Sequence, residues 1–397
     1  MANAITAFNP AYWMNEMQPT FYKESVALGI ANVELRSDLK NGDTLHKPYR
    51  SALKDQAYVK ATDITVQDVS ATDEYLVVDT ARIVPFYVDD LDKIQNKWDA
   101  VAEFAMDGMR RLNNVLDRAI LNEYSNAKKY VDAGDVGGSA GSNISMSTSN
   151  IHKVFTRARV KISMMDVPMS DNFAIVGANM MEIINQYLAA RNTVLGDDVN
   201  RNGYMGKFMG WNIYFSNNLP YSANLSIATL PTATDTVVVN GVTFTYVASI
   251  GTTAGNVLRG ADAAASRANL IAAINAASGA GTTYVEPSVA DREILVNSGI
   301  VAAAGSGTNI TLTGYGDISV AETFTDGTDA WSAQTQHTIF GVKGAISLVT
   351  QKSPSVEFRV AEKRLGRYVY PWMLYGKKTF EKDKRRIVDI RISAASF

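Results

Sequence analysis

Apolar residues recur every three or four positions between Leu91 and Asn126. The repeating positions are Ile94, Trp98, Val101, Ala105, Met109, Leu112, Leu116 and Ala119. This spacing gives a helix one apolar face, and at about 1.5 Å per residue the helix would be on the order of 50 Å long. Asp89, Asp90 and Asp92 stand at its start, where they can cap the helix and suit its dipole. A divalent cation could also bind these acids, but the cap explains them without a metal.

A second pattern precedes this helix. Two strand-like runs, "NGDTLHKPY" from Asn41 and "EYLVVDTARIVPFYV" up to Val88, flank a charged middle of about twenty residues. That separation is too long for a tight hairpin turn. The sequence therefore predicts a long protruding β-loop.

Helices and strands alternate after the long helix. Residues 134–150, "GDVGGSAGSNISMSTSN", are rich in Gly and Ser and predict a flexible linker. Then follow a helix stopped at Pro168, a buried strand "FAIVGA", a helix "NMMEIINQYLAARN", and a loop and strand ending in "GWNIYFSNNLP". Such a mixture indicates an α/β or α+β body.

The chain changes character after Pro220. "DTVVVNGVTFTYV" predicts a hairpin, because Asn240-Gly241 readily adopts the positive φ angles of a type I′ turn. An Ala-rich helix, "DAAASRANLIAAINAAS", and further strands complete a compact α+β insert over residues 222–336. From Thr338 the main body resumes, and its last sixty or so residues read as long antiparallel strands.

Charge separates the insert from the rest of the chain. Residues 222–336 hold nine acids and three bases, whereas the whole 397-residue chain has a net charge of only -2. Two modules of different surface chemistry therefore share one chain. The small net charge gives no general attraction to nucleic acid.

Composition is that of a soluble globular protein, with 46% hydrophobic and 20% charged residues. The absence of cysteine excludes disulfides and thiolate metal sites and fits a reducing cytoplasm. The N-terminus lacks the pattern of a secretory signal, and no apolar run approaches the 18 or so residues of a membrane span.

Candidate chemistry is sparse. Asp198-x-Asn200-x-Asn202-Gly203 repeats the start of an EF-hand calcium loop, but Met209 stands where a bidentate Glu is needed, so a surface loop is favoured. The three histidines, His46, His152 and His337, lie far apart, and His152 near a helix start is interpreted as structural. Motifs for a nucleophile, a zinc site or a phosphate loop are missing. The sequence predicts no enzyme, no metal and no cofactor.

Two further surface patterns have ordinary interpretations. "KKTFEKDKRR" (377–386) could contact phosphate, but Glu381 and Asp383 interrupt it, so a solvated or inter-subunit strand edge is favoured. The spacing of Tyr368, Tyr370, Trp372 and Tyr375 favours a strand face over a base-stacking platform.

Aromatic side chains are concentrated in residues 1–35 without sustained periodicity. They are Phe8, Tyr12, Trp13, Phe21 and Tyr22. An extended arm that buries them on a partner would explain this, and the alternative is an N-terminal helix docked on its own core.

The order of arm, long β-loop, long helix entered by "VDDLDKIQNKWD", mixed domain ending in "GWNIYFSNNLP" and long strands with "YGKK" resembles the major capsid proteins of tailed bacteriophages. The resemblance covers residues 1–221 and 337–397. It implies the α+β Hong Kong 97-type capsid fold, with N-arm, E-loop, long spine helix, and peripheral and axial domains, plus a small inserted α+β, mostly β domain.

The resemblance also implies a division of the chain. The expected parts are the N-arm (1–35), the E-loop and peripheral strands (36–90), the spine helix and peripheral domain (91–149), the axial domain (150–221), the inserted surface domain (222–336), and the axial end with peripheral return strands (337–397). The insert, acidic and free of lysine, would be an outward-facing knob.

Its function would then be assembly through pentamers and hexamers into an icosahedral shell around phage DNA. The implied partners are other copies of the chain, a separate scaffolding protein, a portal and packaged DNA by non-specific proximity, with no membrane. The implied location is the virion capsid, assembled in the host cytoplasm. Expected inter-subunit contacts are Phe8, Tyr12, Trp13, Lys47, Lys54, Asp55 and Lys60. Alternatives are an encapsulin-like nanocompartment shell, or a tail or adhesin component.

Overall fold

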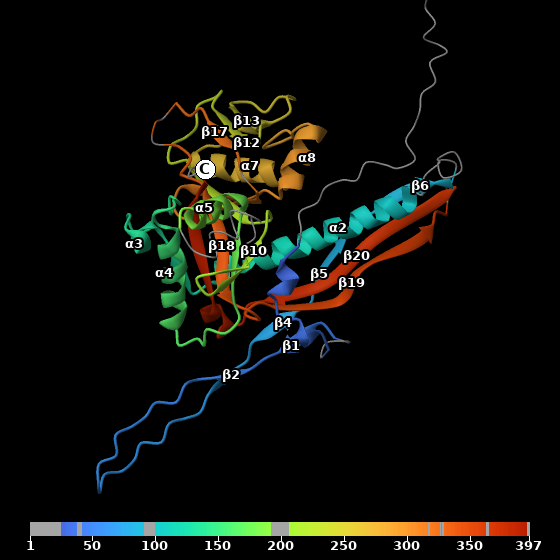
Figure 1. The fold of residues 1–397 in the computed structure, drawn as a ribbon. Coiled ribbons are helices and arrows are strands. Elements are labelled where there is room, and N and C mark those ends of the chain that lie inside the picture. Colours follow the sequence, from blue (N-terminus) through green and yellow to red (C-terminus); the bar gives the residue numbers. More distant parts are fainter. Residues whose placement is uncertain are drawn as a thin grey trace, which may run out of the picture. The chain divides into compact units, whose positions relative to one another are not determined.

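The computed structural model describes residues 25–37, 42–90, 100–191, 206–316, 318–325, 327, 329–362 and 365–394 (Figure 1). The chain forms two compact units. Among the described residues, the first unit comprises 35–37, 42–90, 100–116, 349–362 and 365–376. The second unit takes the remaining described residues, which include 117–191 and 206–316.

The predicted long helix is confirmed as α2 (Ala100–Leu121), while residues 91–99 lie outside the described part. Ala105 and Leu112 are buried on its apolar face. Between them, Gly108 permits close packing, because a Cβ there would lie 2.8 Å from the Pro371 ring. The helix cap expected at Asp89 or Asp90 stays a prediction, since Asp90 is helical but residues 91–99 lie outside the described part. Asp89 ends a strand and is paired with Gly366.

A four-stranded sheet accompanies α2 in the first unit. Its strands are β5 (Thr80–Ile83), β6 (Phe86–Asp89), β19 (Ser347–Val360) and β20 (Gly366–Lys378), with β20 between β19 and both short strands. Burial alternates along β20, so Val369 and Met373 are covered whereas Tyr370 and Trp372 are partly exposed. The expected long strands are confirmed, but Tyr375 is buried with the covered set instead of sharing a face with Trp372.

The predicted β-loop is also present. β1 (Thr44–His46) pairs with β4 (Tyr75–Val77), and β2 (Tyr49–Arg50) pairs with β3 (Ala71–Thr72). Residues 51–70 connect these paired limbs as a long excursion from the sheet (Figure 1).

A nine-stranded sheet organises the second unit. Its main path is β15-β16-β11-β18-β8-β10-β9, and β21 and β7 extend it beside β18. The strands are β7 (Lys129–Val131), β8 (Asn172–Val176), β9 (Lys207–Phe208), β10 (Trp211–Phe215), β11 (Pro220–Ser226), β15 (Val301–Ala304), β16 (Asn309–Tyr315), β18 (Thr335–Val342) and β21 (Ile387–Ser393).

β18 is the central strand of this arrangement. β21 pairs with it along residues 335–341, while β11 pairs with residues 335–336 and β8 with residues 340–342. Because a strand has only two edges, β11 and β8 share the edge that β21 leaves free. The sheet therefore joins the strand that enters the insert to the strand that leaves it.

Two helices cover one face of the sheet, and both were predicted. α4 (Ile151–Ser163) ends before Pro168, and α5 (Ala178–Ala189) follows the fully buried strand β8. Phe155 from α4 meets Phe340 and Phe208 with ring centroids 4.8 Å apart in each pair. These contacts belong to one apolar core that also includes Trp211.

The linker predicted over residues 134–150 was wrong. The short helix α3 (Ala133–Val136) begins there, capped by Asp132, which accepts hydrogen bonds from the backbone N–H groups of Asp135 (3.3 Å) and Gly141 (2.7 Å). Ile144 and Met146 are buried farther on. Burial of these two apolar side chains fixes a segment whose composition alone suggested flexibility.

The insert has a core of its own. A four-stranded sheet, β14-β13-β12-β17, packs with α7 (Ala263–Asn275) and α8 (Val289–Ser298) around buried side chains such as Val237, Phe244 and Leu270. Its strands are β12 (Thr236–Val239), β13 (Val242–Val247), β14 (Asn256–Leu258) and β17 (Val320–Glu322). The hairpin between β12 and β13 is as predicted, with φ of 50° at Asn240 and 82° at Gly241. α8 was not predicted.

The last strand differs from the expected grouping with the peripheral return strands. β21 pairs with β18 and β7 in the nine-stranded sheet, whereas β20 lies in the four-stranded one. Among the described residues, no helix is both long enough and apolar enough to cross a membrane.

Candidate functional site

The loop formed by residues 51–70 exposes a group of large apolar side chains. Six large apolar side chains on it are 63–87% exposed, namely Leu53, Tyr58, Val59, Ile64, Val66 and Val69. Clusters of exposed apolar side chains are typical of protein interaction surfaces. This loop is therefore the first candidate for a contact with another chain.

Hydrogen bonds hold the two limbs of the loop together. The Ser51 N–H donates to the Ser70 carbonyl at 3.1 Å. The Gln67 side chain bonds both backbone groups of Lys54, accepting from its N–H at 3.0 Å and donating to its carbonyl at 2.5 Å. The loop therefore has a defined path although its side chains face solvent.

The structure places four of the predicted contact residues on or beside this loop. Lys54, Asp55 and Lys60 lie on the loop itself, and Lys47 lies at its base, where its N–H donates to the Glu74 carbonyl at 2.6 Å. All four are exposed. The other three predicted contacts, Phe8, Tyr12 and Trp13, lie outside the described residues.

The described N-terminal segment docks on its own chain. The carboxylate of Asp117, which is fully buried, accepts hydrogen bonds from the Val26 N–H at 2.9 Å and the Ser25 hydroxyl at 3.2 Å. Farther along, Ile30 is buried and Asn32 exchanges backbone hydrogen bonds with the segment 346–348. Residues 25–32 are therefore held as an irregular docked segment, whereas the aromatic residues on which the expected arm rests lie outside the described residues.

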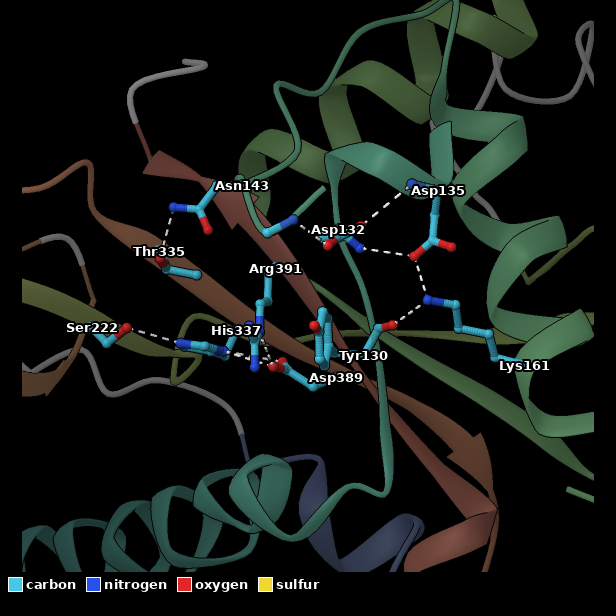
Figure 2. A network of polar contacts seen from close by, with 11 residues as sticks. Tyr130, Asp132, Asp135, Asn143, Lys161, Ser222, Thr335, His337, Asp389 and Arg391 are labelled. Carbon is cyan, nitrogen blue, oxygen red and sulfur yellow. Dashed lines mark hydrogen bonds and ion pairs between the residues drawn. The ribbon is translucent and has the colours of Figure 1, made fainter. Parts of the chain in front are cut away.

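A polar network crosses four strands of the nine-stranded sheet (Figure 2). His337 Nε2 lies 2.9 Å from the Ser222 hydroxyl, and its Nδ1 lies 3.1 Å from both carboxylate oxygens of Asp389. Arg391 donates to Asp389 at 3.2 Å and lies 3.9 Å from the centroid of the Tyr130 ring. The network links the first residue of the insert, the strand after the insert and the C-terminal strand.

Ser222, His337 and Asp389 have the residue types of a hydrolase triad, but their surroundings favour a structural role. Ser222 lies within β11, where both neighbouring strands pair with it, and the ring of Tyr124 stacks on His337 with centroids 4.0 Å apart. A nucleophilic serine instead sits on a sharp exposed turn beside free N–H donors. Sequence reasoning missed the network because its members are far apart in the chain.

Burial affects the pKa of Tyr124, whose ring stacks on His337. Burial raises the pKa of Tyr124 to about 12, and the Asp389 carboxylate adds to the effect. Tyr124 therefore remains a neutral phenol, a form that burial favours beside a carboxylate.

A second buried carboxylate, Glu123, has its pKa lowered. Burial acts to raise that pKa, but the charge of Lys377 at 2.9 Å and hydrogen bonds from Lys377, Thr379 and Asn126 outweigh it. Other charges of the run 377–386 are also paired within the chain, as in the Lys384–Glu381 pair at 2.7 Å. The run is therefore largely neutralised locally, as a solvated strand edge would be.

The exposed face of the four-stranded sheet contains a cavity of about 370 Å³. Tyr370, Trp372 and Ile83 line it, with Arg82, Glu357 and Arg359 at the same site. The buried Nε1 of Trp372 has no hydrogen-bond partner among the described residues, and the Lys352 ammonium lies 5.3 Å from the ring centroid. This face could accept an apolar group that brings a hydrogen-bond acceptor.

The described residues contain no group of three or more His, Asp or Glu side chains that could hold a metal ion. The EF-hand-like segment 198–203 lies outside them. His152, near the start of α4, stacks on Tyr187 with centroids 5.7 Å apart, in keeping with the structural role expected for it.

Solved structures with the same fold come from bacteriophages. A structure from Mycobacterium phage Che8 matches with a TM-score of 0.60 at 15% identity, covering 97% of this chain and 98% of that chain. The capsid structure of the cyanophage P-SCSP1u matches with a TM-score of 0.56 at 11% identity, covering 99% and 95%. The chain has the fold of phage capsid proteins.

The asymmetric unit of the mature capsid of bacteriophage PhiM1 agrees, with a TM-score of 0.52 at 11% identity and coverage of 98% and 93%. The α+β Hong Kong 97-type capsid fold expected from the sequence is thereby confirmed. No protein-family model matches the chain, and no curated protein matches it. The similarity to capsid proteins is therefore seen in the structure, because the sequence identities of 11–15% are too low for the sequence comparisons to detect it.

Proposed function

We propose that this chain is the major capsid protein of a tailed bacteriophage. The observation that carries the proposal is that a capsid structure matches 99% of the chain and 95% of its own length. A match over both whole chains is more specific than a shared single domain, although fold alone does not determine function. In this function the chain binds other copies of itself through pentamers and hexamers, and no catalytic step is required.

The loop 51–70 and the N-terminal arm would lie across neighbouring subunits. The exposed apolar side chains of the loop support this, because a neighbour would remove them from water. Many copies of a modest contact stabilise a closed shell, since the same burial is repeated at every symmetric interface. Lys47, Lys54, Asp55 and Lys60 are the charged contacts proposed beside these apolar groups, together with Phe8, Tyr12 and Trp13 in the arm.

The insert over residues 222–336 would be a knob on the outer surface of the shell. Its separate apolar core and its excess of acids support this assignment, since acidic side chains suit solvent better than packaged DNA. The other proposed parts are the N-arm (1–35), the E-loop with peripheral strands (36–90), the spine helix and peripheral domain (91–149), the axial domain (150–221) and the closing segment (337–397).

Negative-stain electron microscopy of the purified full-length chain, with light scattering for mass, tests the function. We expect closed icosahedral shells, or pentamers and hexamers, with a separate scaffolding protein and a portal completing the particle in the host cytoplasm. A chain that stays monomeric even with its scaffold would contradict the proposal. Shells that enclose protein cargo instead of DNA would indicate a nanocompartment, and tubes or fibres would indicate a tail or adhesin component.

A further inference from the structure

Helix α4 is strongly basic. The helix carries Lys153, Arg157, Arg159 and Lys161 and has no Asp or Glu. Like charges four residues apart disfavour an isolated helix, so this pattern is not explained by helix formation. The basic residues of α4 therefore contrast with the acidic composition of residues 222–336 in the same unit.

A groove of about 540 Å³ lies between α4 and α3. Lys153, Thr156, Arg157 and Val160 line one side, and the short segment 134–137 lines the other. Positions 153, 157 and 160 fall on one face of a helix, so both cations are directed to the same groove.

Arg157 is fixed at the groove. Its Nε donates to the Asp135 carbonyl at 3.0 Å, which leaves the Nη1 and Nη2 donors without a hydrogen-bond partner among the described residues. Lys153 likewise takes part in no ion pair within the described part of the chain. Two cations therefore share the groove without an internal counter-charge.

The one acid that lines the groove is already neutralised. The Asp135 carboxylate pairs with Lys161, which also donates to the Tyr130 carbonyl at 2.5 Å, as Figure 2 shows. Asp135 also accepts a hydrogen bond from the Asp132 N–H at 3.2 Å. The positive charge of Lys153 and Arg157 is thus left for an external anion.

We propose that the groove between α3 and α4 binds the phosphodiester backbone of double-stranded DNA. A fixed guanidinium beside an ammonium and a hydroxyl is suited to phosphate oxygens, and such contacts carry no base specificity. The proposal rests on the proposed capsid function, because the shell would present one such groove per subunit to its enclosed DNA. It assigns α4 to the inner surface of the shell.

Salt dependence of binding tests the groove directly. Full-length protein is titrated into a fluorescein-labelled DNA duplex at several salt concentrations, and anisotropy gives the affinity. If the two cations each neutralise one phosphate, the double variant K153Q/R157Q lowers the slope of log affinity against log salt by about 1.8. Both side chains are exposed, so circular dichroism should show an unchanged fold.

The matched control is K207Q/R259Q, which removes the same charge from exposed positions outside the lining of the groove. The proposal is supported if the control keeps the wild-type slope while the slope for K153Q/R157Q is reduced by about 1.8, the value for two phosphate contacts. It is overturned if the groove variant keeps the wild-type slope, or if both variants lose equally, since net charge would then explain binding.

Two competitors distinguish other anions. Displacement of DNA by millimolar inorganic phosphate at constant ionic strength would identify a free-phosphate site and overturn the proposal. Stronger binding of polyglutamate than of DNA, with the same dependence on Lys153 and Arg157, would indicate an acidic protein partner and also overturn it. Microscopy of the same preparations separates the two proposals, because shells that form without groove-dependent DNA binding leave the capsid function intact.

Discussion

At the scale of single residues, buried carboxylates connect segments that are distant in sequence. Asp117 accepts hydrogen bonds from Val26 and from the Asn218 side chain at 2.9 Å each, so one side chain of α2 fixes both an N-terminal segment and the residue before Leu219. An acid in this position cannot be recognised from the sequence, because its partners are 91 and 101 residues away.

Replacing Asp117 with Ala should destabilise the subunit. The change removes the acceptor of three hydrogen bonds, those from Ser25, Val26 and Asn218, and a buried group that loses its partner costs about 1–3 kcal/mol. Denaturant unfolding followed by circular dichroism measures the loss. Glu103→Ala, at an exposed position of the same helix, is the control and should change the free energy of unfolding by less than about 0.5 kcal/mol. Equal stability of the two variants would show that the Asp117 contacts contribute nothing.

Glu123 predicts a dependence of stability on pH. Its pKa in the folded state lies below the ordinary value of 4.5, so its contribution is present above that pH and is lost as the pH falls through the folded-state pKa. Glu123→Gln should therefore lower the free energy of unfolding by about 1–3 kcal/mol at neutral pH. The difference from wild type should shrink in acid, as urea titrations at several pH values would show. A difference that stays constant with pH would contradict this role.

At the scale of elements, local patterns predicted α2, α4, α5 and the β12–β13 hairpin. Each has a regular apolar period or a turn with a specific conformational demand, such as φ of 82° at Gly241. α8 was missed because exposed Val289 and Val296 obscure its single buried residue, Leu295. The place of β21 could not be predicted, since pairing with β18 depends on contacts across the whole chain.

The loop 51–70 can be tested without affecting the fold of the subunit. Val66 is 87% exposed, so Val66→Asp should leave unfolding unchanged but reduce assembly, because a charge would enter an apolar contact. Charge reversal at Lys54, Asp55 or Lys60 should act in the same direction. Sedimentation through a sucrose gradient gives the fraction of subunits in shells.

Val289→Asp, at an 80% exposed position of α8, provides the matched control for the loop and should assemble as wild type does. If the loop variants assemble normally, the loop does not lie at a subunit interface. If the control fails as well, added negative charge alone explains the result.

At the scale of the whole molecule, the proposed insert, residues 222–336, contains an apolar core that is distinct from the core beneath α4 and α5. The change in composition predicted a separate module here, and the structure adds that β11, β16 and β15 continue the nine-stranded sheet. The boundary at residue 222 therefore falls inside a strand and not in a linker.

A deletion of the insert should keep the whole of β11, because this strand crosses the predicted boundary. A variant that keeps Pro220–Ser226 and Thr335–Val342 and joins them by a short Gly/Ser linker retains the Ser222–His337 contact. We expect it to form shells with a smaller outer diameter by electron microscopy. Complete loss of folded protein would show that the insert is required for the main body and is not an independent module.

The way in which β18 is shared has a mechanical consequence. A module joined by a flexible linker could change its orientation. Here, Tyr221 and Ser222 of β11 pair with Gln336 and Thr335 of β18 in an antiparallel ladder. β21 holds the opposite edge of the same strand. A force along the strands would therefore have to break the backbone hydrogen bonds between β11 and β18 together, not one after another. Through β18, the strand that enters the proposed insert and the C-terminal strand are thus parts of one hydrogen-bonded sheet.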